Sequence, residues 1–298
     1  MNGNYILEIQ GLQKSYGKFT ALKDISFNVA RGKIIGLLGK NGAGKTTLIK
    51  TILGLLKNYN GKIIYDGTLI DTSNPVVMSS IGSLVDTAFH EDLTAYDNLK
   101  LLMMVSPSKV TKNQKEDILE LLKLVGLTGS SKSKVKSFSF GMKQRLALAQ
   151  ALMGEPKLLV LDEPFVGLDP LGIEMIKNKL LDSCREKGVS VIFSSHQLSE
   201  VAEISDDIVI IKDGKIDYSG TYTTLADEAK KYHIILNKEL DIDILKNFNI
   251  IISDDKKEIV INHSDNIINE ALKTLFMHDL SIKNITVEEN ALFSFFKS

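Results

Sequence analysis

Residues 39–46 have the types and the spacing that a phosphate-binding loop needs, since they read Gly-Lys-Asn-Gly-Ala-Gly-Lys-Thr after a short apolar run. Glycines let the backbone fold closely around a phosphate group, so that its N–H groups point inward. A helix beginning at Lys45 adds the positive end of its dipole. The Lys45 ammonium can bind the β- and γ-phosphates, and the Thr46 hydroxyl can bind Mg²⁺. The loop predicts a nucleotide site formed by Gly39, Asn41, Gly42, Ala43, Gly44, Lys45, Thr46 and Thr47.

Two adjacent carboxylates, Asp162 and Glu163, follow the apolar run 158–161. Beside a phosphate loop, Asp162 can hold Mg²⁺ through its water shell, and Glu163 can polarise the attacking water. Without such a loop, a helix cap or an ordinary surface pair would explain both residues equally well. The combination predicts nucleotide hydrolysis, with Lys45 and Glu163 as catalytic residues.

Alternating strands and helices must bring these residues together. The apolar runs 33–38, 158–161 and 189–193 are short and have the character of buried strands. Helices are predicted over 45–55 and 171–187, and this alternation predicts an α/β fold with a largely parallel sheet. Further strands are expected at 6–9, 26–29 and 81–85, and further helices at 93–105, 111–127 and after Gly141.

The composition changes after about residue 226, where the chain becomes richer in Ile, Asn, Lys and Asp. We expect a nucleotide-binding domain over 1–226 and a small α/β extension over 227–298. A regulatory or dimerising role for the extension and a plain packing role both fit the sequence. The pattern predicts a strand at 232–237, a helix at 241–247, strands at 248–253 and 257–262, a helix at 266–278 and a strand at 281–287.

Composition excludes several classes of protein. Lys and Arg total 36 against 37 Asp and Glu, so no global attraction to nucleic acid or to an anionic membrane follows. Cys184 is the one cysteine, which rules out an intrachain disulfide. No apolar run approaches the roughly 18 residues of a membrane span. We expect a cytoplasmic protein that reaches a membrane through a partner.

Residues 138–145 read Phe-Ser-Phe-Gly-Met-Lys-Gln-Arg, just upstream of Asp162. This segment resembles the signature of ATP-binding cassette (ABC) ATPases, usually Leu-Ser-Gly-Gly-Gln. Ser139 and Gly141 fit the signature, whereas Phe140 and Met142 depart from it. The resemblance implies that Ser139 and Gly141 contact ATP held by a second cassette, so that two cassettes enclose two ATP molecules. A serine-capped amphipathic helix is an equally valid description and does not compete.

Three smaller matches follow the order of the family. Tyr16 lies where an ABC aromatic residue stacks on adenine, although strand packing alone would also explain it. Residues 167–169 resemble the loop that couples the two nucleotide sites, which implicates Asp169. His196 matches the switch histidine, whose implied role is catalytic: it senses the γ-phosphate and holds Glu163 and the water in place.

Asp86 departs from the family pattern. Most ABC proteins have Gln after the strand that corresponds to residues 81–85, and either side chain offers an oxygen to Mg²⁺. ATPases of bacitracin and lantibiotic export or self-immunity often carry an acidic residue there. Residues 87–99 and 138–145 are similar to the same group. The implied metal ligands are therefore Thr46, Asp162 and Asp86.

The resemblance covers residues 5 to 226. It implies an ABC ATPase core with an antiparallel β subdomain and a helical subdomain over about 87–155. The implied cofactors are ATP and Mg²⁺, and the implied partners are a second cassette, as a homodimer, and a separate transmembrane permease that exports a peptide antibiotic or similar amphipathic compound. A soluble mechanochemical ABC ATPase acting on ribosomes or nucleic acid is the alternative. The single cassette, the absence of sustained heptads and the balanced charge disfavour it.

Overall fold

The structure is a computed structural model that describes residues 4–70, 80–105, 113–228, 230–245, 248, 250–262 and 265–288. The chain divides into two compact units, Met1–Ser219 and Gly220–Ser298. The second unit thus begins before residue 227, where the sequence placed the boundary. The helix α8 (Tyr222–Glu228) runs across that expected boundary, and its continuity explains the difference.

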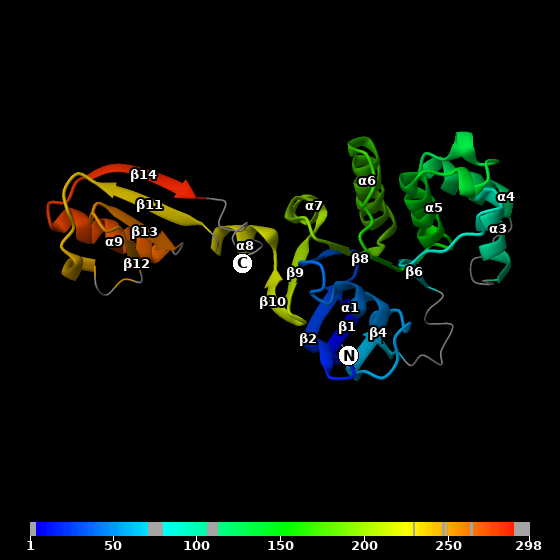
Figure 1. The fold of residues 1–298 in the computed structure, drawn as a ribbon, viewed down its shortest axis with the longest axis horizontal. Coiled ribbons are helices and arrows are strands. Elements are labelled where there is room, and N and C mark those ends of the chain that lie inside the picture. Colours follow the sequence, from blue (N-terminus) through cyan, green and yellow to red (C-terminus); the bar gives the residue numbers. More distant parts are fainter. Residues whose placement is uncertain are drawn as a thin grey trace. The chain divides into compact units, whose positions relative to one another are not determined.

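A mostly parallel sheet forms the centre of the first unit (Figure 1). Within the described residues its strands are, in spatial order, β10 (Lys215–Gly220), β9 (Asp207–Lys212), β3 (Ile34–Leu38), β8 (Ser190–Ser195), β7 (Leu158–Leu161) and β6 (Ile81–Leu84). Pairing is parallel from β9 through β3, β8 and β7 to β6. Every residue of β3, β7 and β8 is buried, as expected for strands covered on both faces. In such sheets, ligands bind at the carboxyl ends of the strands. The predicted site residues follow the carboxyl ends of β3, β7 and β8.

A second, antiparallel sheet packs on the phosphate-loop helix α1 (Lys45–Ile52). Its strands are β2 (Phe19–Ala30), β1 (Tyr5–Tyr16), β4 (Asn60–Tyr65) and β5 (Thr68–Leu69), in spatial order. Ile9 and Leu22 of this sheet and Ile49 of α1 belong to one buried cluster. Helix α1 ends before the predicted residue 55, because Gly54 adopts a positive φ of 67°.

The helical part of the first unit contains α3 (Ala95–Val105), α4 (Gln114–Leu124) and α5 (Phe140–Leu152), which gather beyond β6 in Figure 1. Two short 3-10 turns, η2 (Thr128–Ser130) and η3 (Val135–Ser137), link α4 to α5. Helix α4 begins later than predicted, and residues 111–112 lie outside the described ranges. Helices α6 (Pro170–Lys187) and α7 (Leu198–Ile204) flank β8 along the chain. Among the helices that the structure describes, none is long and apolar enough to cross a membrane.

The second unit has its own sheet and its own hydrophobic core. The sheet order is β12 (Ile250–Ile252), β13 (Glu258–Asn262), β11 (Lys231–Leu236) and β14 (Ile282–Glu288), and α9 (Asp265–Met277) contributes Ala271 and Leu275 to the core. The helix expected over 241–247 is instead the 3-10 turn η4 (Ile242–Leu245). Asp241 accepts a hydrogen bond from the Asp243 N–H at 3.2 Å, a local bond that competes with helical pairing.

Candidate nucleotide site

The phosphate loop connects β3 to α1, and its glycines allow close backbone approaches. Gly44 has a φ of 114°, and a Cβ on it would lie 2.9 Å from the Ala21 carbonyl oxygen. A Cβ on Gly39 would lie 2.4 Å from the Ile211 carbonyl oxygen. Larger residues at either position would push the loop away from β2 or β9, so these two glycines fix its tight path.

Lys45 lies at the first position of α1 and points back into the loop. Its Nζ donates to the Gly39 carbonyl oxygen at 2.6 Å and lies 3.5 Å from Glu163 Oε1. The residue is only 6% exposed. A cation held at this depth, between the loop and a carboxylate, is suited to bind phosphate oxygens without competition from bulk water.

The two carboxylates after β7 are held by Ser194, at the end of the neighbouring strand β8. Ser194 Oγ donates to Asp162 Oδ1 at 2.6 Å and accepts the Glu163 N–H at 2.8 Å. His196 Nδ1 lies 3.0 Å from Glu163 Oε2. The structure thus brings the predicted residues Lys45, Asp162, Glu163 and His196 together. Sequence reasoning missed Ser194, although a hydroxyl directly after the predicted strand 189–193 and two residues before His196 was a usable signal.

A hollow of about 390 Å³ lies over the phosphate loop. Two aromatic residues form one side of it: Tyr16, which was predicted, and Phe19, which was not. They are directly paired across the β1–β2 hairpin, and Phe19 is 65% exposed. The hairpin sequence Tyr-Gly-Lys-Phe could have indicated the second ring, since a two-residue turn places its flanking residues opposite each other. The other predicted residues that line this hollow are Asn41, Gly42, Gly44, Lys45, Thr46, Thr47 and Glu163.

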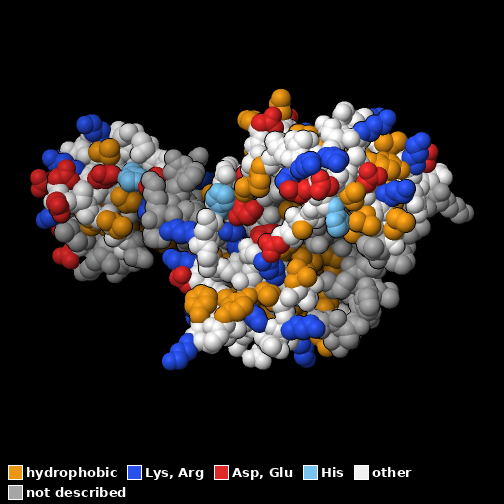
Figure 2. All heavy atoms as spheres, turned by 45° about the vertical axis from the view of Figure 1, so that its right-hand side comes forward, with side chains coloured by type: hydrophobic (Ala, Val, Ile, Leu, Met, Phe, Trp, Pro, Cys, Tyr) orange, Lys and Arg blue, Asp and Glu red, His pale blue; other side chains and the backbone are white. Residues whose placement is uncertain are grey.

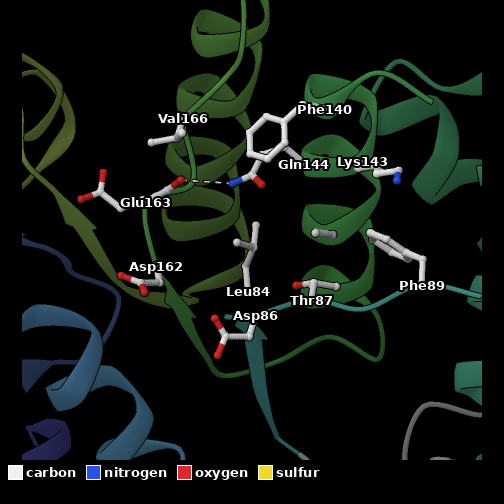
Figure 3. Close-up of a pocket in the computed structure, with 11 residues that line it drawn as sticks. Leu84, Asp86, Thr87, Phe89, Phe140, Lys143, Gln144, Asp162, Glu163 and Val166 are labelled. Carbon is white, nitrogen blue, oxygen red and sulfur yellow. Dashed lines mark hydrogen bonds between the residues drawn. The ribbon is translucent and has the colours of Figure 1, made fainter. Parts of the chain in front are cut away.

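Asp86 lies beside a second hollow, also of about 390 Å³, which Asp162 and Glu163 line as well (Figure 3). Its carboxylate contacts Lys50 Nζ at 2.5 Å, and this hydrogen bond raises the pKa of Lys50. Among the described residues, no group of three or more His, Cys, Asp and Glu side chains is arranged to hold a metal ion. Hydroxyl and carboxylate oxygens from Thr46, Asp162 and Asp86 nevertheless suit Mg²⁺, which commonly keeps waters and phosphate oxygens as its other ligands.

The remaining predicted residues lie at the N-termini of α5 and α6. Ser139 caps α5 and accepts the Met142 N–H at 3.3 Å, whereas Asp169 caps α6 and accepts the Gly172 N–H at 3.1 Å. Gly141 lies against the turn that ends at Gly167. The hollow over the phosphate loop is lined by other described residues. Within this single chain, Ser139, Gly141 and Asp169 therefore do not line the hollow over the phosphate loop.

Comparison with known proteins identifies the family. Residues 22–166 match the ABC transporter family. The lantibiotic transport ATP-binding protein SrtF of Streptococcus pyogenes is 41% identical over 222 residues, which cover 72% of this chain and 93% of SrtF. The bacitracin transport ATP-binding protein BcrA of Enterococcus faecalis is 39% identical over 229 residues, which cover 76% of this chain and 73% of BcrA.

A solved structure agrees with these relatives. The dimeric structure of a post-hydrolysis state of the ATP-binding cassette MJ0796, bound to ADP and Pi, has a TM-score of 0.66 and 25% identity over 72% of this chain and 98% of that one. ABC cassettes work as dimers with a transmembrane permease. The phosphate loop, the carboxylates after β7 and these likenesses lead to one conclusion: the chain belongs to the ABC transporter ATP-binding proteins, the subunits that hydrolyse ATP to drive transport.

Proposed function

We propose that this chain powers a separate membrane permease that exports, or gives resistance to, a peptide antibiotic or a similar amphipathic compound. The relatives SrtF, a lantibiotic transport ATP-binding protein, and BcrA, a bacitracin transport ATP-binding protein, support this cargo class. The acidic residue Asp86 and the similarity of its surroundings to that group add to the support. The chain would then work in the cytoplasm, at the inner face of the membrane, held there by the permease.

The placement of the His196 and Lys45 side chains beside the Glu163 carboxylate is the observation that carries the catalytic proposal. Glu163 Oε2 lies 3.0 Å from His196, and Glu163 Oε1 lies 3.5 Å from Lys45. Glu163 orients and polarises the attacking water, and His196 keeps the carboxylate in place. Lys45 stabilises the negative charge that develops on the phosphoryl oxygens.

Three oxygen donors complete the proposed site. Asp162 is anchored by Ser194, and Thr46 lines the hollow over the phosphate loop. With Asp86, they would hold Mg²⁺, whose contribution when bound is to neutralise phosphate charge. Asp86 must first exchange its contact with Lys50 for the metal, which makes it the weakest of the three candidate ligands.

The second cassette in this proposal is another copy of the same chain. Ser139 and Gly141 at the start of α5, together with Asp169, would contact ATP bound by that copy. The dimer of MJ0796 supports this arrangement. ATP would then act as the adhesive between two cassettes, since a ligand that binds the dimer stabilises it by mass action. Each hydrolysis cycle would open the dimer again.

Nucleic acid is a poor fit as the partner. On the face shown in Figure 2, the described Lys and Arg side chains are interspersed with Asp and Glu side chains. A nucleic-acid surface instead gathers Lys and Arg in a continuous patch or stripe. The charges on this face, together with the balance of 36 Lys and Arg against 37 Asp and Glu over the whole sequence, favour a permease partner over ribosomes or DNA.

The deciding experiment uses tagged Glu163→Gln with MgATP to capture partners from detergent-solubilised native membranes. We expect kcat of this variant to fall by about 100-fold or more, because general-base assistance contributes ~10²–10⁴-fold. We also expect a multi-span membrane protein to be recovered, because the variant stays closed on ATP. A wild-type rate would disprove the role of Glu163. Recovery of ribosomes or nucleic acid alone would overturn the transporter assignment.

A further inference from the structure

The backbone of Glu163 has an unusual conformation. Its φ is 47°, in the left-handed region that residues with a Cβ adopt when the surrounding contacts over-determine it. Two side chains hold the polar groups of this backbone. Ser194 Oγ accepts the Glu163 N–H at 2.8 Å, and Gln144 Nε2 donates to the Glu163 carbonyl oxygen at 3.1 Å. The N–H of Glu163 is therefore held by a residue of β8, and its carbonyl oxygen is held by a residue of α5.

Helix α5 also touches the segment after Glu163. A Cβ on Gly167 would lie 2.1 Å from the Phe140 ring, which shows how closely the ring covers that glycine. A Cβ on Gly141 would lie 3.0 Å from the Gly167 carbonyl oxygen. Phe140 and Gln144 are four residues apart and therefore share one face of α5. Figure 3 shows this face directed toward the loop that carries Glu163 and Val166.

We propose that Gln144 is a positioning residue for hydrolysis: its amide holds Glu163 in the left-handed conformation that aims the carboxylate at its catalytic partners. The proposal rests on the catalytic role proposed above for Glu163. When the bond is lost, the peptide after Glu163 is free to rotate toward the ordinary α or β regions. The Glu163 carboxylate then leaves its place beside His196 and Lys45.

The bond also connects Glu163 to the helix that Ser139 caps. If α5 shifts as Ser139 and Gly141 engage the second cassette, the Glu163 carbonyl must follow or the bond must break. The orientation of Glu163 in one cassette thereby depends on the position of its own signature helix. A link of this kind favours hydrolysis when α5 is in the position seen here.

The test compares Gln144→Met and Gln144→Glu with Gln150→Met, a change of the same residue type on the same helix. Met and Glu have helix propensities close to that of Gln, so α5 should persist in every variant. Neither Met nor ionised Glu donates to the Glu163 carbonyl oxygen. We expect kcat to fall about 10-fold, which corresponds to ~1.4 kcal/mol and lies within the range of one hydrogen bond. KM for ATP should stay within about 2-fold, and Gln150→Met should keep the wild-type kcat.

The second arm repeats Gln144→Met in the Glu163→Gln background and measures residual hydrolysis under single-turnover conditions. Because Gln144 acts through Glu163, the residual rate should change by less than about 2-fold. An equal 10-fold loss in both backgrounds would overturn the proposal, since a general defect in folding or ATP binding acts without Glu163. A wild-type kcat in both Gln144 variants, together with an inactive Glu163→Gln, would also overturn the proposal. That outcome would leave the proposed function intact. A fully active Glu163→Gln would instead reject the proposed function itself.

Discussion

The Asp86 carboxylate lies 2.5 Å from the Lys50 ammonium, so the segment that follows β6 contacts the helix of the phosphate loop. The Asp86 side chain is 72% exposed, and its backbone has a positive φ of 43°. Asp at this position does more than replace the amide of Gln, because its charge allows an ion pair within the same chain. The ion pair and a metal ion compete for the same carboxylate.

That competition makes Lys50→Met a test of the metal site. Removal of the ammonium frees the Asp86 carboxylate, so the Mg²⁺ concentration for half-maximal ATP hydrolysis should fall about 2- to 5-fold, the range of an exposed ion pair. Asp86→Asn should raise that concentration. The measurement is a Mg²⁺ titration of ATPase rate at fixed ATP, with Lys100→Met, an exposed lysine of α3, as control. An unchanged midpoint in both variants would remove Asp86 from the metal ligands.

The paired rings of Tyr16 and Phe19 predict how the base is held. Loss of one aromatic–base stack costs ~1–3 kcal/mol, so Phe19→Ala should weaken ATP binding by about 5-fold or more. The factor should be similar for GTP, because stacking recognises the ring face and not its edge. Calorimetry in the Glu163→Gln background gives both dissociation constants. Phe276→Ala, which removes a 61% exposed ring from the second unit, should change neither. Equal affinities in wild type and Phe19→Ala would show that Tyr16 alone stacks.

Local signals decided how well the sequence predicted the fold. The helix expected at 171–187 is α6, and it carries an Asp169 cap, Pro170 in its first turn and Gly188 after its end. The helix expected at 45–55 was too long, because Leu53 and Leu55 continue the apolar spacing beyond Ile52, where α1 ends. Strands β9 and β10 were not predicted individually, and β9 pairs with β3 from far away in the sequence. Such partners cannot be read from a local pattern.

The same distinction applies to the site. The phosphate loop is one continuous segment, so its residues could be predicted from their spacing alone. Ser194, Gln144 and Lys50 act on residues that other elements supply, and their roles depend on which strand or helix lies beside them. Sequence alone gave no register between β7 and β8. The support around Glu163 therefore required the structure.

The close contact between Gly167 and Phe140 predicts a rescue. Gly167→Ala should lower the midpoint of thermal unfolding and reduce kcat, because its Cβ meets the Phe140 ring and its φ is 75°. When Phe140→Ala is added to Gly167→Ala, part of both losses should be restored, because the ring is gone. The strain of the positive φ at position 167 remains. Thermal unfolding and ATPase rates of the two single variants and the double variant give the coupling. Strictly additive losses would contradict the contact.

His233 predicts a pH dependence in the second unit. It lies 2.8 Å from Glu258 and 3.2 Å from Glu288, on the two strands that flank β11, and these hydrogen bonds raise the pKa of His233. A raised folded-state pKa gives stability that is fully present below about pH 6.5, the unfolded value, and is lost as the pH rises through the folded value. The unfolding midpoint should therefore fall toward alkaline pH in the wild type. His233→Gln should flatten this dependence, whereas His278→Gln should leave it unchanged.

Removal of the second unit tests the role of the extension. The proposed catalytic residues lie in the first unit, and the second unit buries its own core around Ile234 and Leu275. We therefore expect a chain that ends at Ser219 to stay folded and to bind ATP with nearly wild-type affinity. With Glu163→Gln and ATP, light scattering should still report a dimer, because the proposed contacts of Ser139 and Asp169 remain. If the dimer formed only with the second unit present, that unit would have a dimerising role. The expected result, an unchanged dimer, would exclude that role.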